Sequence, residues 1–288
     1  MRALLVSLRP RQWVKNLVLF AGILFTLDRP HPPGDWLRAG AAFGLFCLLS
    51  GAVYLFNDVA DREQDRQHPD KRRRPIAAGK LAPAVALAVG TGLALGGAGA
   101  AFLLGLSFGA AALAYLLLTF AYTFWLKHAV ILDVLALATG FVLRAVAGAI
   151  AVGVEISPWL LVCTTLGALF LGLGKRRAEL TTLQEEAGKH RSSLEEYTPE
   201  LLDQMITVVA ASTLMAYALY TFTSQTATGH RTLMATIPFV IYGIFRYLFL
   251  VHTRNVGGSP TSELLEDRPL LLCIALWGIA CAAIILWG

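Results

Sequence analysis

The sequence is poor in charged residues. Only 15% of its 288 residues are Asp, Glu, Lys or Arg, whereas soluble domains usually carry about 25%. Hydrophobic residues make up 56% of the chain, and the mean hydropathy is +0.62. This composition excludes an ordinary soluble domain and indicates a membrane protein.

Cysteine and histidine are also scarce, with four and six residues respectively. All four cysteines lie in apolar segments, and no two of them form a C-x-x-C pair. This spacing argues against structural disulfides and against a zinc site. No histidine stands out as a catalytic base.

The hydrophobic residues are concentrated in long runs. A transmembrane helix needs roughly 17–25 predominantly apolar residues, and nine runs of the sequence qualify. They lie near residues 13–27, 37–57, 81–104, 106–124, 129–151, 158–173, 204–223, 234–251 and 269–287. The sequence therefore predicts an all-α polytopic membrane protein with a single transmembrane domain over residues 1–288.

Basic residues fall mainly on one side of this predicted bundle. If the N-terminus is cytoplasmic, 19 of the 24 Lys and Arg residues lie in cytoplasmic segments and three lie in external ones. Because cytoplasmic loops carry an excess of Lys and Arg, we expect the N-terminus inside, the C-terminus outside, and the chain in the plasma (inner) membrane. The net charge of +5 is concentrated on that face, which indicates anionic lipids or phosphorylated substrates as partners and not nucleic acid.

Two predicted cytoplasmic loops, about 58–80 and 174–203, are long and strongly charged. Loops much longer than about a dozen residues tend to be functional or disordered. Both loops contain stretches compatible with a helix, so we predict that they form ordered caps on the bundle.

The first cap opens with the stretch NDVADREQD. If the preceding helix continues through it, Asn57, Asp61 and Asp65 stack on one face at a spacing of four residues. Asp58 lies on the neighbouring stripe. Oxygen ligands without His or Cys suit Mg²⁺, which usually takes one or two carboxylates and completes its shell with water and phosphate oxygens.

The basic run HPDKRRRP follows at once. Its Lys71 and Arg74 are candidates for binding phosphate, because a diphosphate needs carboxylates for its metal and cations for its oxygens. The alternative is that this loop is only solvated and that its basic cluster is a topology signal. Acids stacked at every fourth position favour the diphosphate site.

The form N-D-x-x-D-x-x-x-D of this stretch resembles the first aspartate-rich motif of the UbiA superfamily of intramembrane prenyltransferases. The resemblance covers essentially the whole chain and implies nine transmembrane helices around a cytoplasm-facing polar cavity, with a Mg²⁺-bound diphosphate. It implies that Asn57, Asp58, Asp61 and Asp65 bind the metal and that the three aspartates are catalytic. The segments RPRQWVKN, HPDKRRRPIAAG, LKHAVILDV, GFVLRAVAG and GKRRAEL are similar to one branch, the decaprenyl-phosphate phosphoribosyltransferases.

The sequence departs from the wider superfamily after the sixth predicted span. Typical members carry a second aspartate-rich motif there for a second Mg²⁺, but residues 175–200 contain no aspartate. Lys175, Arg176 and Glu179 take that place, and the gain of cations argues for an additional substrate phosphate. Lys175 and Glu179, four residues apart, can equally form a plain ion pair on the helix surface.

Three further cations are candidate substrate-binding residues. Lys15 lies where the first span enters the membrane, and Lys127 lies near the cytoplasmic end of the fifth span. Arg144 lies in the middle of a span, where an unpaired charge is costly, so we expect it to face protein or a wet cavity. Alternatively, Arg144 is a structural tie to backbone carbonyls.

These observations predict a Mg²⁺-dependent transferase. It would move the 5-phosphoribosyl group of 5-phosphoribosyl-1-diphosphate (PRPP) to a polyprenyl (decaprenyl) phosphate, and the resemblance implies that the product is a precursor of cell-wall arabinose donors. One alternative is a UbiA-type prenyltransferase that uses a polyprenyl diphosphate and an aromatic or small polar acceptor, but the missing second aspartate pair argues against it. Another is a transporter of phosphorylated molecules, but the charges cluster on one face. A homo-oligomer is compatible with the sequence.

Overall fold

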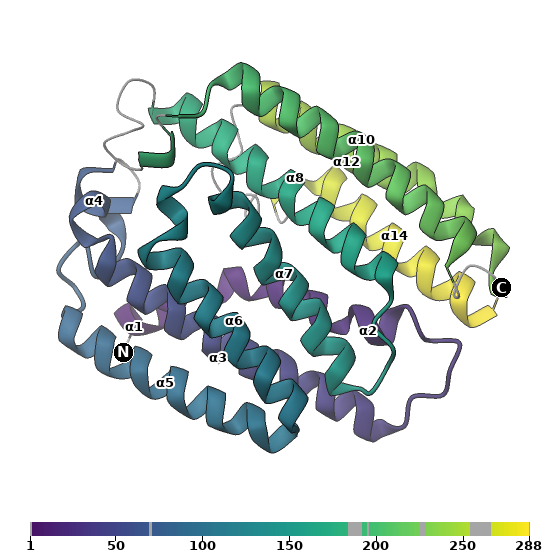
Figure 1. Ribbon diagram of the computed structural model, residues 1–288, viewed down its shortest axis with the longest axis horizontal. Coiled ribbons are helices and arrows are strands. Elements are labelled where there is room, and N and C mark those ends of the chain that lie inside the picture. The colour runs from purple at the N-terminus through teal and green to yellow at the C-terminus, as the bar shows by residue number, and fades with distance from the viewer. Residues whose placement is uncertain are drawn as a thin grey trace.

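The computed structural model describes residues 2–68, 71–183, 192–194, 196–224, 229–253 and 266–287. In this part of the chain, long α-helices lie side by side and run between the same two ends of the molecule (Figure 1). They are α3 (Pro33–Ala60), α5 (Pro83–Leu104), α6 (Leu106–Phe124), α7 (Leu132–Ala151), α8 (Pro158–Leu183), α10 (Pro199–Thr223), α12 (Ile237–Thr253) and α14 (Arg268–Trp287). The short elements are α1 (Arg2–Ser7), η1 (Pro10–Phe20), α2 (Ala21–Leu24), α4 (Arg62–Gln67), η2 (Lys71–Arg73), η3 (Leu126–His128), η5 (Ser192–Leu194) and η6 (Arg231–Thr236), where η denotes a 3-10 helix.

Proline marks the start of several long helices. The helices α3, α5, α8 and α10 begin at Pro33, Pro83, Pro158 and Pro199. Proline suits the first helical position because its fixed φ is already helical and its missing N–H would have no helical partner there. Between α5 and α6 the chain turns at Gly105, whose φ of 145° strains any residue with a side chain. Proline and glycine therefore help to fix where these helices begin and end.

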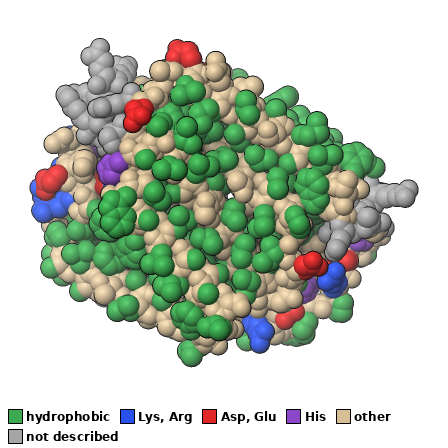
Figure 2. All heavy atoms as spheres, viewed as in Figure 1, with side chains coloured by type: hydrophobic (Ala, Val, Ile, Leu, Met, Phe, Trp, Pro, Cys, Tyr) green, Lys and Arg blue, Asp and Glu red, His purple; other side chains and the backbone are tan. Residues whose placement is uncertain are grey.

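Eight of the helices in the described residues are long and apolar enough to cross a membrane. Many of their large hydrophobic side chains are exposed, among them Leu95, Leu103 and Leu117. Figure 2 shows hydrophobic side chains over most of the visible face, with charged side chains near its edges. An exposed apolar surface of this extent marks contact with lipid. The structure confirms an all-α, multi-pass membrane protein.

The predicted first span, residues 13–27, differs from the others. The chain forms the 3-10 helix η1 and then the short α2 there, so this segment is not among the eight, and the predicted count of nine is not confirmed. A 3-10 helix rises about 2.0 Å per residue, against about 1.5 Å in an α-helix. The 11 residues of η1 therefore extend over about 22 Å. A crossing at this place needs fewer residues than the rule for α-helices assumes.

The helices pack in two groups that meet along α7. One hydrophobic cluster joins α7 to α8, α10, α12 and α14, and it includes Val134 and Leu173. A second cluster joins η1, α3, α5, α6 and α7, and it includes Leu19 and Phe46. The helix α7 therefore contacts both groups, the first through Val134 near its start and the second through Ala147 and Ala151 near its end.

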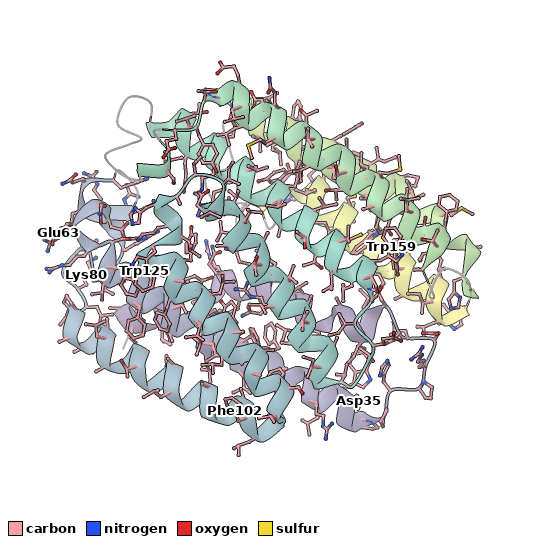
Figure 3. All side chains as sticks on the ribbon, in the orientation of Figure 1. Asp35, Glu63, Lys80, Phe102, Trp125 and Trp159 are labelled. Carbon is pink, nitrogen blue, oxygen red and sulfur yellow. The ribbon has the colours of Figure 1, made fainter. Side chains whose placement is uncertain are left out.

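The two ends of the bundle carry different segments. Glu63, Lys80 and Trp125 lie at one end, and Asp35 lies at the other (Figure 3). The first end carries α4, with the aspartate motif, and η3, which precedes α7. We call it the aspartate end.

Candidate active site

The aspartate motif lies where α3 ends and α4 begins. The helix α3 ends at Ala60, and Asp61 has φ −91° and ψ 9°, a bridge conformation between two helices. The helix predicted to continue through the motif is therefore interrupted. Backbone bonds with helical spacing still cross the interruption, from Asp61 N–H to Asn57 O and from Asp65 N–H to Asp61 O, both at 2.8 Å. The acids thus keep the four-residue spacing on which the predicted site depends.

Two arginines neutralise the buried acids Asp58 and Asp65. Arg74 Nη1 donates to Asp58 Oδ1 at 3.2 Å and to Asp65 Oδ2 at 2.6 Å, so one guanidinium bridges both carboxylates. Arg9, just before η1, donates to the same oxygen of Asp58. Burial raises the pKa of Asp65 above its ordinary value, and the charge of Arg74 opposes that rise. The charge of Arg74 therefore favours the ionised form of Asp65.

Asp61 lies at the more open side of the cluster. Its side chain is 25% exposed, whereas that of Asp58 is 1% exposed. Asp61 accepts a hydrogen bond from Asn57 Nδ2 at 3.0 Å and pairs with Lys127 of η3. The loop before α7 is thereby linked to the end of α3. We call Asn57, Asp58, Asp61 and Asp65 the aspartate cluster.

One oxygen of this cluster has no partner. Asp58 Oδ2 is buried and receives no hydrogen bond, although Oδ1 of the same carboxylate is bound by two arginines. A buried polar atom is costly to leave without a partner, and hard oxygen donors suit Mg²⁺. In the described residues, no three His, Cys, Asp or Glu side chains are arranged to hold a metal ion. These carboxylate and amide oxygens fit a hard divalent cation. When such an ion binds, it would replace the arginine and lysine side chains that now pair with the carboxylates.

Lys71 and Arg74 belong to the segment that follows α4. Lys71 begins η2, which packs against α4. The charge of Lys71 acts on both Asp65 and Lys175. The two predicted caps, although about a hundred residues apart in the sequence, therefore share one charged region.

The second predicted motif forms a buried ion-pair network. Arg176 is fully buried, its Nε donates to Asp133 Oδ2 at 2.6 Å, and its Nη1 pairs with Glu179. Its Nη2 donates to the Tyr122 hydroxyl at 3.2 Å. Asp133 also accepts a hydrogen bond from the Tyr197 hydroxyl at 2.9 Å. We call Asp133, Arg176 and Glu179 the buried triad.

Lys175 and Arg176 have different environments although they are neighbours in the sequence. Lys175 Nζ lies 3.7 Å from a Glu179 oxygen, and its side chain is 35% exposed. The plain ion pair considered above is therefore present. Arg176 is directed into the protein because successive helical residues point about 100° apart. Substrate contact by either residue stays a prediction, and the structure favours Lys175 for it.

Arg144 is buried where η1, α6 and α7 meet. Its Nε donates to Asn16 Oδ1 at 2.8 Å, and its Nη1 donates to Gly140 O at 3.0 Å. Its Nη2 donates to the Tyr115 hydroxyl at 2.8 Å, and the guanidinium lies 4.6 Å from the centroid of the Tyr115 ring. These bonds tie Arg144 to side chains as well as to a carbonyl, and a role of its charge in substrate binding stays a prediction. Lys15 precedes Asn16 on η1 and is partly buried.

Two backbone features of the site have no individual signal in the sequence. Arg9, which pairs with Asp58, has φ 52°, a left-handed conformation uncommon outside glycine. Ile131, just before α7, has φ 68°, and its N–H donates to the Tyr197 hydroxyl at 2.7 Å. Strained backbone of this kind clusters at functional sites. The segments RPRQWVKN and LKHAVILDV contain these residues, but their letters do not indicate a positive φ.

Comparison with known proteins finds relatives that match most of the chain. The UbiA prenyltransferase family matches residues 17–262. The chain is 40% identical to a decaprenyl-phosphate phosphoribosyltransferase of Corynebacterium glutamicum, over 94% of this chain and 83% of the relative. It is 34% identical to a protein of the same name from Mycobacterium tuberculosis, over 98% of this chain and 94% of the relative.

Solved structures share the fold. A UbiA homolog from Archaeoglobus fulgidus bound to DMAPP and Mg²⁺ matches with a TM-score of 0.74 at 18% identity, over 98% of both chains. A structure of digeranylgeranylglyceryl phosphate synthase matches with a TM-score of 0.67 at 17% identity, over 99% of both chains. At such identities the likeness shows the fold alone.

Proposed function

The chain belongs to the UbiA prenyltransferase family, and from that premise we propose that it transfers the 5-phosphoribosyl group of PRPP to a polyprenyl phosphate and releases diphosphate. The name of relatives that are 34–40% identical over most of the chain supports this reaction. The observation that carries the proposal is the aspartate cluster, with its unpartnered buried oxygen, beside the cations Arg9, Arg74 and Lys127. Carboxylates and cations in one place suit a diphosphate with its metal.

The aspartate cluster would hold Mg²⁺. Asp58 Oδ2 has no protein partner, so it could bind the ion without breaking a hydrogen bond. Asp61 is the most accessible of the three acids. When bound, the ion would neutralise and orient the diphosphate of PRPP. A magnesium-bound relative of the same fold supports this assignment.

The protein cations would stabilise the leaving group. Arg9, Arg74 and Lys127 now donate to the acids of the cluster, and phosphate oxygens would accept from the same N–H groups. As the bond from C1 to the diphosphate oxygen breaks, negative charge grows on that oxygen, and donors placed beforehand stabilise it. The electron pair of the broken bond leaves with the diphosphate.

The acceptor would need no general base. A phosphate oxygen of the polyprenyl phosphate attacks C1, so one C–O bond forms while the other breaks. This oxygen is already anionic near neutral pH, and no proton has to be removed from it. Lys71 and Lys175, whose charges act on each other beside the cluster, would bind further phosphate oxygens of PRPP.

The proposed orientation places the aspartate end in the cytoplasm, as the distribution of Lys and Arg predicts. A reporter inserted between α8 and α10 should then read as cytoplasmic, and one fused after Gly288 should read as external. Both reporters on the same side would contradict the odd number of crossings. In this orientation PRPP and the lipid phosphate would meet at the inner face of the plasma membrane, and the product would be available as a precursor of cell-wall arabinose donors.

The reaction is tested with the purified protein in detergent. We expect incubation with PRPP, Mg²⁺ and decaprenyl phosphate to yield decaprenyl-phosphoryl-5-phosphoribose, identified by mass spectrometry of the lipid fraction. A parallel incubation with a polyprenyl diphosphate and an aromatic acceptor should yield no prenylated product. A prenylated product without any phosphoribosylated lipid would overturn the proposal in favour of a prenyltransferase.

A further inference from the structure

The 3-10 helix η1 places Lys15 at the edge of the protein interior. Side chains three residues apart eclipse in a 3-10 helix, so η1 has three faces. The face with Asn16 and Leu19 is buried, and the face with Arg11 and Leu17 is exposed. Lys15 lies on the third face and is partly buried. The Lys15 side chain is therefore neither fully exposed nor fully packed into the core.

Lys15 has no protein partner among the residues that the structure describes, since its amine makes no hydrogen bond or ion pair there. The charged groups that act on it most strongly are Lys175, Arg144 and Arg9, and all three are cations. The Lys15 amine has lost part of its water, has no hydrogen-bond acceptor and lies near other cations. Its positive charge is therefore unfavourable in this environment. Such an arrangement is expected where an anion completes it.

Arg144 shows a related imbalance. Its hydrogen bonds go to Asn16, Gly140 and Tyr115, which are all neutral acceptors. Through the bond to Gly140 O, its guanidinium reaches back by one turn of α7 toward the aspartate end. Arg9 and Lys175 differ in this respect, because each of them pairs with an acid.

We propose that Lys15 and Arg144 form a second anion site, distinct from the aspartate cluster, that binds a phosphomonoester. Lys15 makes the direct contact, and Arg144 contributes positive charge from a fixed position because its donors already have partners. Two cations without an acid suit a bare phosphate group, whereas the aspartate cluster suits a metal-bound diphosphate. The identity of the ligand rests on the proposed function, in which both substrates carry one phosphomonoester: PRPP at C5 and the polyprenyl phosphate at its head.

The first test measures binding without turnover, in Mg²⁺-free detergent solution. Lys15→Met keeps the length of the side chain and removes its charge, and Lys80→Met is the matched control at an exposed lysine. We expect Lys15→Met to unfold at a higher temperature than the wild type without anions, since a repelled charge is gone. We expect inorganic phosphate to stabilise the wild type, Lys80→Met and Asp61→Asn alike.

The same titration should show weaker phosphate binding by Lys15→Met, by roughly tenfold or more, which corresponds to about 1.4 kcal/mol. Unchanged binding by Lys15→Met would overturn the site. So would a loss of binding in Asp61→Asn alone, since the phosphate would then occupy the aspartate cluster. This readout needs no product, so it stands or falls separately from the proposed reaction.

The second test identifies the source of the phosphate. A rise in KM for PRPP alone in Lys15→Met would assign the site to the C5 phosphate of the donor. A rise in KM for the polyprenyl phosphate alone would assign it to the acceptor. Either result supports the site, whereas equal rises for both substrates, or none, would contradict it. If the wild type makes no phosphoribosylated lipid, the proposed function fails and the binding result decides the anion site by itself.

Discussion

An arginine bridges two carboxylates in two different regions of the protein. In the aspartate cluster, Arg74 bridges Asp58 and Asp65 through Nη1; in the buried triad, Arg176 bridges Asp133 and Glu179 through Nε and Nη1. The side chain of Arg74 is 25% exposed, and that of Arg176 is 0% exposed. The two regions therefore have the same kind of contact and opposite access.

This difference in access is what we expect between the proposed binding site and a structural support. Arg74 follows the short η2, and the acid beside it keeps an unpartnered oxygen, so we propose that this bridge exchanges its partners for an ion and a substrate. Arg176 lies within the long helix α8, with a carboxylate on each side and a tyrosine hydroxyl beside it. A buried charge with all its partners in place favours one fixed arrangement. Glu179, held by the triad, in turn pairs with Lys175 at the edge of the site.

The largest expected effect tests whether the aspartate cluster is the exchangeable region. Asp61→Asn keeps the size of the side chain and removes the charge of the most accessible acid. We expect turnover to fall by at least roughly 10²–10³-fold, in line with the loss of one preorganised charge-stabilising group. Steady-state assays with PRPP and the lipid phosphate measure it.

Metal removal provides the control for that experiment. EDTA should abolish turnover of the wild type, and added Mg²⁺ should restore it, because the carboxylates are proposed to act through the ion. The far-UV circular dichroism of Asp61→Asn should match that of the wild type, since Asp61 is only partly buried. Full activity in EDTA would refute the metal assignment.

The next effect concerns the stability of the buried triad. Removing one partner of a buried ion pair leaves an uncompensated charge and typically costs about 3–5 kcal/mol. We expect Arg176→Met to lose that much of its free energy of unfolding, measured by denaturant titration in detergent. Arg74→Met should lose less, because Arg74 is 25% exposed and Arg9 still pairs with Asp58. Replacing Asp133 and Glu179 by Asn and Gln in the Arg176→Met background should recover part of the loss. A stable Arg176→Met variant whose only defect is a raised KM for PRPP would show that Arg176 binds substrate.

A third experiment examines the residue that joins the two regions. Lys175→Ala removes a charge-assisted contact, worth roughly 1.5–3 kcal/mol, which corresponds to about tenfold to a hundredfold in apparent affinity. We expect the loss as a higher KM for PRPP, with the KM for the lipid phosphate little changed. A variant weakened for the lipid and normal for PRPP would overturn this assignment.

Much of the architecture could be predicted because long apolar runs in a sequence identify the segments that lie in a bilayer. Long apolar runs have to be helices in a bilayer, since their backbone groups find no water there, and eight of the predicted spans correspond to such helices. The segment at 13–27 could not be described correctly, because hydropathy does not distinguish a 3-10 helix from an α-helix. The helix η1 packs against α3 and α7, and these tertiary contacts are not visible in the hydropathy of the segment.

The sequence predicted which residues belong to the candidate site better than it predicted which residues they pair with. The spacing of the acids places Asn57, Asp61 and Asp65 together, because four residues is close to one helical turn. The buried environment of Arg176 could not be predicted from the sequence, since its partner Asp133 comes from another helix and is 43 residues away. The charge pattern of a segment therefore indicates that ions are paired there, but burial of the pairs depends on tertiary packing.

The smallest expected effect comes from comparing an exposed and a buried acid within the single helix α4. Glu63 and Asp65 lie two residues apart in α4, and each pairs with an arginine, Arg66 at 3.1 Å and Arg74 at 2.6 Å. The Glu63 side chain is 70% exposed, whereas that of Asp65 is 4% exposed. Exposed ion pairs contribute about 0–1 kcal/mol because water and salt screen them.

We therefore expect Glu63→Gln to change the free energy of unfolding by no more than about 1 kcal/mol and to leave turnover unchanged. Asp65→Asn, its matched variant, should lose most of its turnover. The pair of assays compares two acids with the same secondary structure and the same kind of partner, so any difference between them comes from burial and from the proposed metal. Equal losses in both variants would mean that pairing with arginine, and not access to the buried cluster, determines the function of an acid in this cap.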